Sequence, residues 1–263
     1  MRSHVLTATS PAPAPRGATE SRLVVQVLPD AAAVARRAAD LVAELLLAGG
    51  LRTFGVATGS TPSPVYAELA ARGLPGWDGV RLFALDEYVG LPAGHPESYR
   101  AVIEREAAGP LGVPLDQVHV PDGTADDPRA AADAYEAALA AAGGADVQLL
   151  GIGANGHIGF NEPGSPLGSR TRVVDLDERT RADNARFFDS PAQVPHHAVT
   201  QGVATIGTAR RHLLLATGAA KAEAVRAALE GPVGPACPAS AVRLFTDVHV
   251  LLDTAAASLL TRA

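Results

Sequence analysis

The 263-residue chain contains only one cysteine, Cys237. A single cysteine excludes a disulfide bond within the chain and is typical of a reducing compartment, so we expect a cytoplasmic protein. In this sequence Cys237 is better interpreted as a small buried apolar side chain than as a reactive thiol.

Long apolar runs are also missing. No stretch approaches the ~18 apolar residues of a membrane span, and residues 1–20 lack the apolar core of a signal peptide. Their Pro, Ala, Ser and Thr content predicts a disordered N-terminal tail instead. We therefore expect no membrane association and one folded domain over residues 21–263, with enough apolar residues (47%) for a sizeable core.

Positive charge is scarce, because the formal net charge is −6. A nucleic-acid surface needs a basic patch, so we expect no nucleic-acid partner. Of the 22 basic residues only Lys221 is a lysine. This single lysine has two alternative explanations: chance in an arginine-rich chain, or a need for one compact ammonium group.

Apolar segments of strand length alternate with helical segments along the chain. Strands are expected at 22–28, 53–58, 80–85, 118–120, 146–150, 212–217 and 248–252. Helices are expected at 30–48, from the GSTP turn to about 72, around 98–107 with Ser98 as the cap, at 130–142 and from about 220. This alternation predicts a single α/β domain with a mostly parallel central sheet and helices on both faces.

Polar segments follow four of these strands at the points where the strands end. They are GST after 53–58, Asp86-Glu87 after 80–85, a Gly-rich loop with His157 and Glu162 after 146–150, and GAAK after 212–217. Ligands of parallel sheets bind beyond the carboxyl ends of the strands. We therefore expect one site at this edge.

The turn Thr58-Gly59-Ser60-Thr61 joins a strand to a helix. Glycine lets the backbone approach an anion, hydroxyls donate hydrogen bonds, and a helix N-terminus presents free N–H groups. The turn is a candidate phosphate site, although an ordinary turn with an N-cap threonine has the same pattern. It is not a Walker loop, because GxxxxGK[ST] does not occur.

The segment GIGANG (151–156) matches the dinucleotide fingerprint G-x-G-x-x-G, but the fingerprint should open a long helix. Pro163, Pro166 and further glycines follow here, so we exclude NAD and expect no cofactor. The loop instead presents His157 and Glu162, an imidazole with a carboxylate that can fix its tautomer. Metal binding is poorly supported, because there is no HExxH motif and no cysteine cluster.

Asp86 is the candidate general base. A solvated turn or a helix cap is the commoner role of an acid at such a position. A base in a partly closed cleft, with donors that polarise a carbonyl, suffices to remove a proton next to that carbonyl.

Two strings make the sequence resemble a known family. FALDEYVGLPAGHPESYR (83–100) and LLGIGANGHIGFNEPGSPLGSRTRVVDLDERTRADNARFF (149–188) are similar to signatures of the hexosamine-6-phosphate deaminases. GVATGSTP, VPHHAVTQGVATI and TGAAKAEAVRAALEGPV match in order, so the resemblance covers residues 22–253. It implies a Rossmann-like fold of the deaminase/isomerase type and conversion of glucosamine 6-phosphate and water to fructose 6-phosphate and ammonia, without cofactor or metal.

The resemblance also implies roles for individual residues. Asp86 matches the base that moves a proton between C2 and C1, His157 the ring-opening catalyst and Glu162 its carboxylate partner. The substrate phosphate would be bound by Thr58, Gly59, Ser60, Thr61, Arg186 and Lys221, which gives the isolated lysine a function. Arg186 lies in residues 172–197, the segment that forms a mobile lid in the family.

Asn155 departs from the pattern, since the family often has Asp before Gly-His. We include Asn155 in the catalytic loop, but its amide is unable to accept a proton, so it is no acid–base group. Its role is either substrate contact or a turn residue that tolerates positive φ.

Some members of the family are hexamers activated by N-acetylglucosamine 6-phosphate. The positions that match their activator ligands are Ser165, Pro166, Arg172 and Val174. Pro166 lacks a hydroxyl and an N–H, and Val174 lacks a charge. We expect no activation here, and the sequence leaves homo-oligomerisation open.

Three other interpretations are compatible with parts of the sequence. A 6-phosphogluconolactonase has the same fold family, but its signature lacks the DEYVGLP and GFNEPGS strings. A galactosamine-6-phosphate deaminase differs only in the orientation of one substrate hydroxyl. A non-catalytic sugar-phosphate effector module would need a DNA-binding domain, for which the acidic chain offers no room before residue 22.

Overall fold

The computed structural model describes residues 22–261. The predicted disordered tail, residues 1–20, lies outside the described residues. Within them, no helix has both the length and the apolar character needed to cross a membrane.

The centre of the molecule is a seven-stranded sheet in the order β1-β10-β9-β6-β2-β3-β5, in which every neighbouring pair is parallel. Its strands are β1 (Arg22–Leu28), β2 (Thr53–Val56), β3 (Arg81–Ala84), β5 (Val118–His119), β6 (Val147–Gly151), β9 (Arg211–Ala216) and β10 (Asp247–Asp253). All seven were predicted from the sequence, with bounds that agree to within two residues. The predicted fold class is confirmed.

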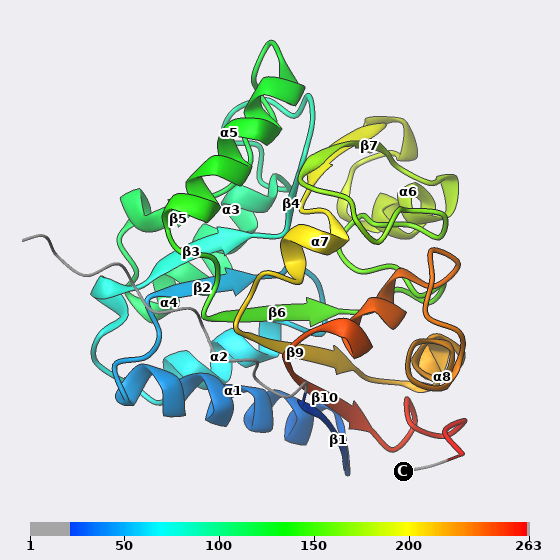
Figure 1. Cartoon of the computed structure of the whole chain (residues 1–263). Helices are drawn as coiled ribbons and strands as arrows, with labels where there is room; N and C mark the ends of the chain where they lie inside the picture. Colours follow the sequence, from blue (N-terminus) through cyan, green and yellow to red (C-terminus); the bar gives the residue numbers. More distant parts are fainter. Residues whose placement is uncertain (1–21, 262–263) are drawn as a thin grey trace, which may run out of the picture.

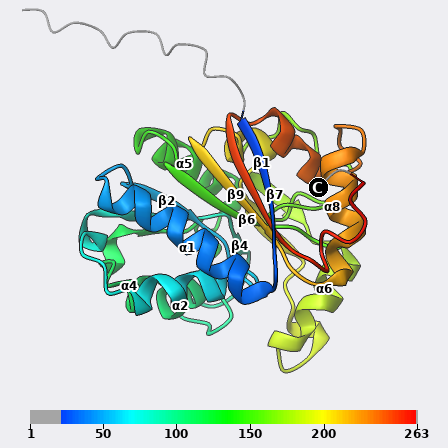
Figure 2. The same ribbon diagram turned by 90° about the horizontal axis from the view of Figure 1, so that it is seen from below.

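Helices cover both faces of this sheet. Figure 2 shows α1 (Ala31–Leu47) and α2 (Ser63–Ala71) on one side of the strands and α8 (Ala222–Glu230) on the other. α5 (Pro128–Ala141) packs Tyr135 and Leu139 against Phe83 of β3. Parallel strands need such cover, because both of their faces are apolar.

The strand β9 illustrates how the sheet separates two cores. Leu213 and Leu215 pack in the core that contains α1 and α2, whereas Leu214 and Ala216 pack in the core that contains α8. Successive side chains of a strand point to opposite faces. Each fully buried leucine stabilises the fold by about 1.5–3 kcal/mol.

Helix α1 begins and ends as its sequence indicates. The Asp30 side chain accepts a hydrogen bond from the Ala33 N–H at 2.7 Å, which caps the helix. Beyond the last turn, Gly49 takes a φ of 69°, a conformation that glycine adopts without strain.

The predicted helix at 98–107 is more irregular than its sequence suggests. Ser98 caps it as predicted, since its Oγ accepts the Ala101 N–H at 3.2 Å. The helix starts as α3 (Tyr99–Ile103), widens into a π-helix (Glu104–Ala108) and ends as α4 (Gly109–Leu111). Single π-helical turns are frequent near functional sites.

A second sheet stands beyond the carboxyl edge of the first, and the sequence did not predict it. It contains β4 (Asp86–Tyr88), β8 (His197–Thr200) and β7 (Arg172–Asp175), paired antiparallel in the order β4-β8-β7. β7 and helix α6 (Glu178–Asn184) lie in the segment 170–190, for which no strand or helix was expected. Strands of three or four mixed residues have no recognisable period, and their pairing joins distant parts of the chain.

Candidate active site

The site lies where the order of the parallel strands changes direction. β2 and β6 are neighbours, but the chain continues from β2 to β3 on one side and from β6 to β9 on the other. The loops after β2 and β6 therefore diverge and leave a crevice, the usual ligand site of such sheets. In Figure 1 the arrowheads of β2, β6 and β9 point to one edge, next to α6 and α8.

A cavity of about 530 Å³ occupies this crevice. Its volume is in the usual range for small-molecule sites. Most of the predicted site residues line it: Thr58, Gly59, Ser60, Thr61, Asp86, His157, Arg186 and Lys221. The structure thus brings four separate strand exits together, as predicted.

Asp86 is the buried acid of this cavity. It begins β4, is 6% exposed and pairs with Thr200 of β8. Burial, together with the negative charge of Glu87, raises the pKa of Asp86 to about 8. Gly159 has a φ of 55°, and a Cβ there would lie 3.2 Å from Asp86 Oδ2, so the chain approaches the carboxyl closely.

His157 and Glu162 form the expected pair. His157 Nδ1 lies 3.2 Å from Glu162 Oε2, and Thr180 of α6 donates to Glu162 Oε1 at 2.5 Å. Burial favours the neutral carboxyl, but hydrogen bonds and the charge of His157 outweigh it and lower the pKa of Glu162 to about 2. Glu162 is therefore an ionised partner that orients the imidazole.

Asn155 lies behind this pair and does not line the cavity. Its Nδ2 donates to Glu162 Oε2 at 2.6 Å, and its Oδ1 accepts the His157 N–H at 3.2 Å. The positive φ considered for Asn155 is wrong, because among residues 22–261 only glycines have positive φ, Gly156 included. In this structure Asn155 holds Glu162 and the loop in place.

The glycines of the G-x-G-x-x-G segment have a packing function. A Cβ on Gly153 would lie 2.3 Å from Cε1 of the His157 ring, so only glycine leaves room for the imidazole. Gly156 has a φ of 88°, and a Cβ there would lie 2.7 Å from Sγ of Cys237. Cys237 is 8% exposed, which confirms its interpretation as a buried small side chain.

The cavity that residues 58–61 line is also lined by two cationic side chains, Arg186 and Lys221. Gly59 has a φ of 110°, and helix α2 follows directly. Lys221 precedes α8, and Arg186 lies on a short 3-10 helix, Ala185–Phe187. Burial lowers the pKa of Lys221. The negative charge of Asp183 raises this pKa, and the positive charge of Arg186 lowers it further. An anion there would relieve the repulsion between the two cations.

The comparison with known proteins agrees with this geometry. The sequence profile of the family described as glucosamine-6-phosphate isomerases/6-phosphogluconolactonase matches residues 29–250. The chain belongs to this family. The resemblance inferred from the sequence is confirmed.

Its relatives include proteins named glucosamine-6-phosphate deaminase. The protein of Pseudarthrobacter chlorophenolicus is 56% identical over 241 residues, which are 91% of this chain and 93% of the relative. That of Streptomyces coelicolor is 55% identical over 243 residues, with the same two coverages.

Solved structures of the family show the same fold. A monomeric glucosamine-6-phosphate deaminase superposes with a TM-score of 0.87 at 40% identity, over 90% of this chain and all of that chain. A 6-phosphogluconolactonase from Trypanosoma brucei gives 0.73 at 25% identity, over 92% of this chain and all of that chain. The present chain is therefore more similar to the deaminase than to the lactonase, in structure and in sequence.

Sequence reasoning missed a chain of polar groups beside the cavity. Asn184 Nδ2 donates to the Tyr88 hydroxyl at 2.8 Å, and the Tyr99 and Tyr88 hydroxyls lie 3.3 Å apart. All three residues line the cavity. Tyr88 and Tyr99 lie inside the first family-like string, and that position was the only signal available for them.

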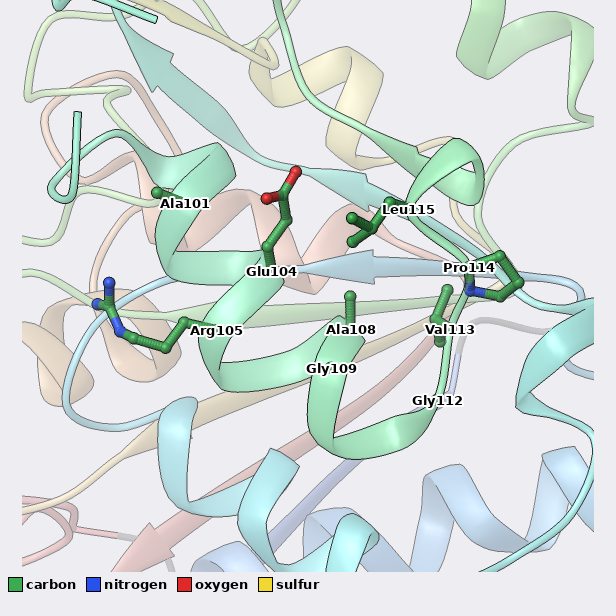
Figure 3. A pocket seen from close by; sticks show the side chains of 9 residues that line it. All are labelled: Ala101, Glu104, Arg105, Ala108, Gly109, Gly112, Val113, Pro114 and Leu115. Atoms are coloured by element: carbon green, nitrogen blue, oxygen red, sulfur yellow. The ribbon is translucent and has the colours of Figure 1, made fainter. Parts of the chain in front are cut away.

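Two further features of the described residues bear on ligands. No three His, Cys, Asp or Glu side chains between residues 22 and 261 are grouped as metal ligands would be. A second hollow, shown in Figure 3, lies on the surface beside the π-helix and is lined mainly by small and apolar side chains with Glu104 and Arg105. None of the predicted site residues lines this second hollow.

Proposed function

We propose that this chain converts glucosamine 6-phosphate and water into fructose 6-phosphate and ammonia. The observation that carries the proposal is one cavity lined by the buried carboxyl of Asp86, by His157, which Glu162 contacts, and by residues 58–61 with Arg186 and Lys221, which we take as the phosphate end. Relatives named for this activity, at 55–56% identity over 91% of the chain, support it.

The first chemical step opens the sugar ring. Glu162 engages Nδ1 of His157, so Nε2 is the ring nitrogen left for a substrate in the cavity. We assign to Nε2 the transfer of the proton from the C1 hydroxyl to the ring oxygen, which breaks the C1–O5 bond and leaves an aldehyde. Ionised Glu162 stabilises the imidazolium that forms during this transfer.

The second step moves a proton between two carbons. Asp86 removes the proton from C2, which leaves an enolamine, and returns it to C1, which leaves an imine at C2. Water adds to the imine, and ammonia departs as the C2 ketone forms. A carboxylate whose pKa is raised to about 8 is a stronger base than an exposed one, which suits the removal of a proton from carbon.

The phosphate end positions the sugar for both steps. The N–H and hydroxyl groups of residues 58–61, with the charges of Arg186 and Lys221, would bind the phosphate. Arg186 comes from the segment 172–197, which also supplies Thr180 and Asn184 to the site. We infer that this segment acts as a lid that closes on the bound phosphate.

The proposed site needs no second subunit, because all of these residues come from one chain. The solved deaminase structure at 40% identity is described as monomeric. We infer that a single chain of this protein is the catalytic unit, and that it works in the cytoplasm, where a chain with one cysteine stays reduced.

The alternatives have less support. Lactone hydrolysis is an activity within the same family, but the lactonase structure is only 25% identical to this chain. An effector module would need no buried base in its cavity, whereas Asp86 is 6% exposed there.

The test is to incubate the protein with glucosamine 6-phosphate and measure ammonia and fructose 6-phosphate. We expect equimolar release of both, and no acceleration of the hydrolysis of 6-phosphogluconolactone. A parallel reaction with galactosamine 6-phosphate determines the preferred epimer. Lactone hydrolysis without ammonia release would replace this proposal by the hydrolase alternative.

A further inference from the structure

Glu87, the neighbour of Asp86, is a buried acid to which the proposed chemistry assigns no role. It is 5% exposed and does not line the cavity. Its Oε1 accepts the N–H groups of Tyr88 at 2.8 Å and of Tyr99 at 2.9 Å, and its Oε2 accepts that of Arg100 at 2.9 Å. All three partners are donors, so these contacts favour the ionised carboxylate.

These contacts join the two ends of the site. Glu87 ties β4, which carries Asp86, to the first turn of α3. In that turn lies Tyr99, whose hydroxyl donates to the Tyr88 hydroxyl at 3.3 Å and lies near Thr58 of the phosphate turn. Glu87 is therefore one of the contacts that hold Asp86 in position relative to residues 58–61, beside the pairing of β3 with β2 and of β4 with β8.

The charge of Glu87 also acts on Asp86 directly. Burial is the larger cause and Glu87 the second cause of the raised pKa of Asp86. Burial raises the pKa of Glu87 too, while the three N–H donors and the Arg100 charge lower it. The other titratable groups around Asp86 are Tyr88 on β4, Tyr99 on α3, Tyr135 on α5 and His157 on the loop after β6.

We propose that Glu87 is a positioning residue that fixes Asp86 against the phosphate turn and keeps a negative charge beside it, so that Asp86 is a stronger base. The proposal rests on the proposed function, because it concerns the same base. Because the charge of Glu87 affects proton binding by Asp86, this effect can be measured without any turnover of substrate.

The variant Glu87→Gln tests the charge. It keeps the size and one acceptor oxygen but removes the charge that disfavours ionised Asp86. We expect the midpoint of the acid limb of kcat/KM, near pH 8 in the wild type, to move to lower pH by on the order of one unit. On the alkaline plateau we expect kcat to fall by about 3–30-fold, since the base is weaker and less well held.

Glu104→Gln is the matched control. Glu104 lies on the π-helix that continues α3 and faces the surface hollow of Figure 3 rather than the cavity. If the effect of Glu87 depends on its proximity to Asp86, Glu104→Gln should leave the midpoint of the acid limb of kcat/KM unchanged. Glu87→Asp keeps the charge but shortens the reach to the N–H groups. It should lower kcat/KM without moving the midpoint.

A spectroscopic titration separates this proposal from the proposed function. The infrared band of the protonated Asp86 carboxyl, assigned by its loss in Asp86→Asn, should titrate at lower pH in Glu87→Gln than in the wild type. An equal midpoint in the two proteins overturns the proposal, whether or not either is active. If Glu87→Gln does not fold, Glu87→Asp decides: an unchanged midpoint with reduced kcat/KM supports the proposal, and a shifted midpoint or unchanged kcat/KM overturns it.

Discussion

Asp86 shows how a single residue can serve catalysis at the expense of stability. In the unfolded chain its carboxyl has a pKa of 3.8, whereas in the fold the pKa is about 8. Between these pH values the folded state holds a proton that the unfolded state releases. The free energy of unfolding therefore falls as pH rises from about 4 to 8 and changes no further above pH 8 on account of this group.

This linkage predicts that Asp86→Asn stabilises the fold at alkaline pH. The amide keeps the size of the carboxyl and has no charge to desolvate. We expect the variant to gain on the order of 1–5 kcal/mol over the wild type at pH 9 and much less at pH 5. Thermal or urea unfolding at the two pH values measures the gain. A gain that is larger at pH 5 than at pH 9 would contradict the raised pKa of Asp86.

Lys221 is the second residue whose proposed function a single substitution can test. If it binds the substrate phosphate, Lys221→Ala should weaken binding of glucosamine 6-phosphate by about 1–3 kcal/mol, the usual value of a charge-assisted contact. Steady-state kinetics should show this as a raised KM.

Two controls accompany this prediction. Arg226→Ala removes an exposed cation from α8, the helix that follows Lys221, and should leave KM unchanged, because Arg226 pairs with Glu223 outside the cavity. The slow reaction with unphosphorylated glucosamine should barely change in Lys221→Ala. Equal damage to both substrates would show a structural role for Lys221.

Among structural elements, the loop after β6 determines the geometry of the imidazole. Gly153→Ala places a methyl group 2.3 Å from the His157 ring, so the ring must move. We expect kcat to fall by about 10–100-fold, since a displacement of about 1 Å can cost that much, and the melting temperature to change little.

Gly168→Ala is the control for this loop. Gly168 follows in the same loop, and a Cβ there would have no heavy atom within 4 Å. Near-wild-type activity is expected for it. If Gly153→Ala also kept full activity, the position of His157 would not depend on this glycine.

Elements also show how far the sequence could predict the structure. The apolar strands and the buried helix faces follow from period and length, because the central sheet is covered on both sides. The second sheet did not follow, since β4 has only three residues and pairs with β8 more than a hundred residues later. Similarly, the link from Asn155 through Glu162 to Thr180 depends on how α6 packs over the loop, which no local pattern encodes.

At the scale of the whole molecule, the two retained positions of the activator site that some family members have contact one another. Arg172, one of the two retained activator ligands, donates to Asn161 Oδ1 at 2.9 Å and to the other, Ser165 Oγ, at 3.3 Å. Burial lowers the pKa of Arg172, so its guanidinium depends on these internal partners. Binding an activator phosphate would have to replace them.

We therefore predict hyperbolic kinetics and no activation by N-acetylglucosamine 6-phosphate. Pro166 and Val174 supply neither a donor nor a charge, and each missing charged contact costs about 1.5–3 kcal/mol. Coupling free energies are typically only ~1–3 kcal/mol. A site that binds the activator so weakly would therefore not change the activity of the enzyme. Rate against substrate concentration, with and without millimolar activator, measures this. A sigmoidal curve that becomes hyperbolic with activator would show an effector site built from other residues.

The central claim is that Asp86 moves the proton from C2 to C1 of glucosamine 6-phosphate. The most direct measurement is the reaction in deuterium oxide, followed by NMR of the fructose 6-phosphate formed, for the wild type and for Asp86→Asn. We predict deuterium at C1 of the wild-type product, because the carboxyl exchanges its proton with solvent, and a kcat lower by about 10²–10⁴ in the folded Asn variant, with KM little changed. Near-normal turnover and the same labelling by Asp86→Asn would contradict the account.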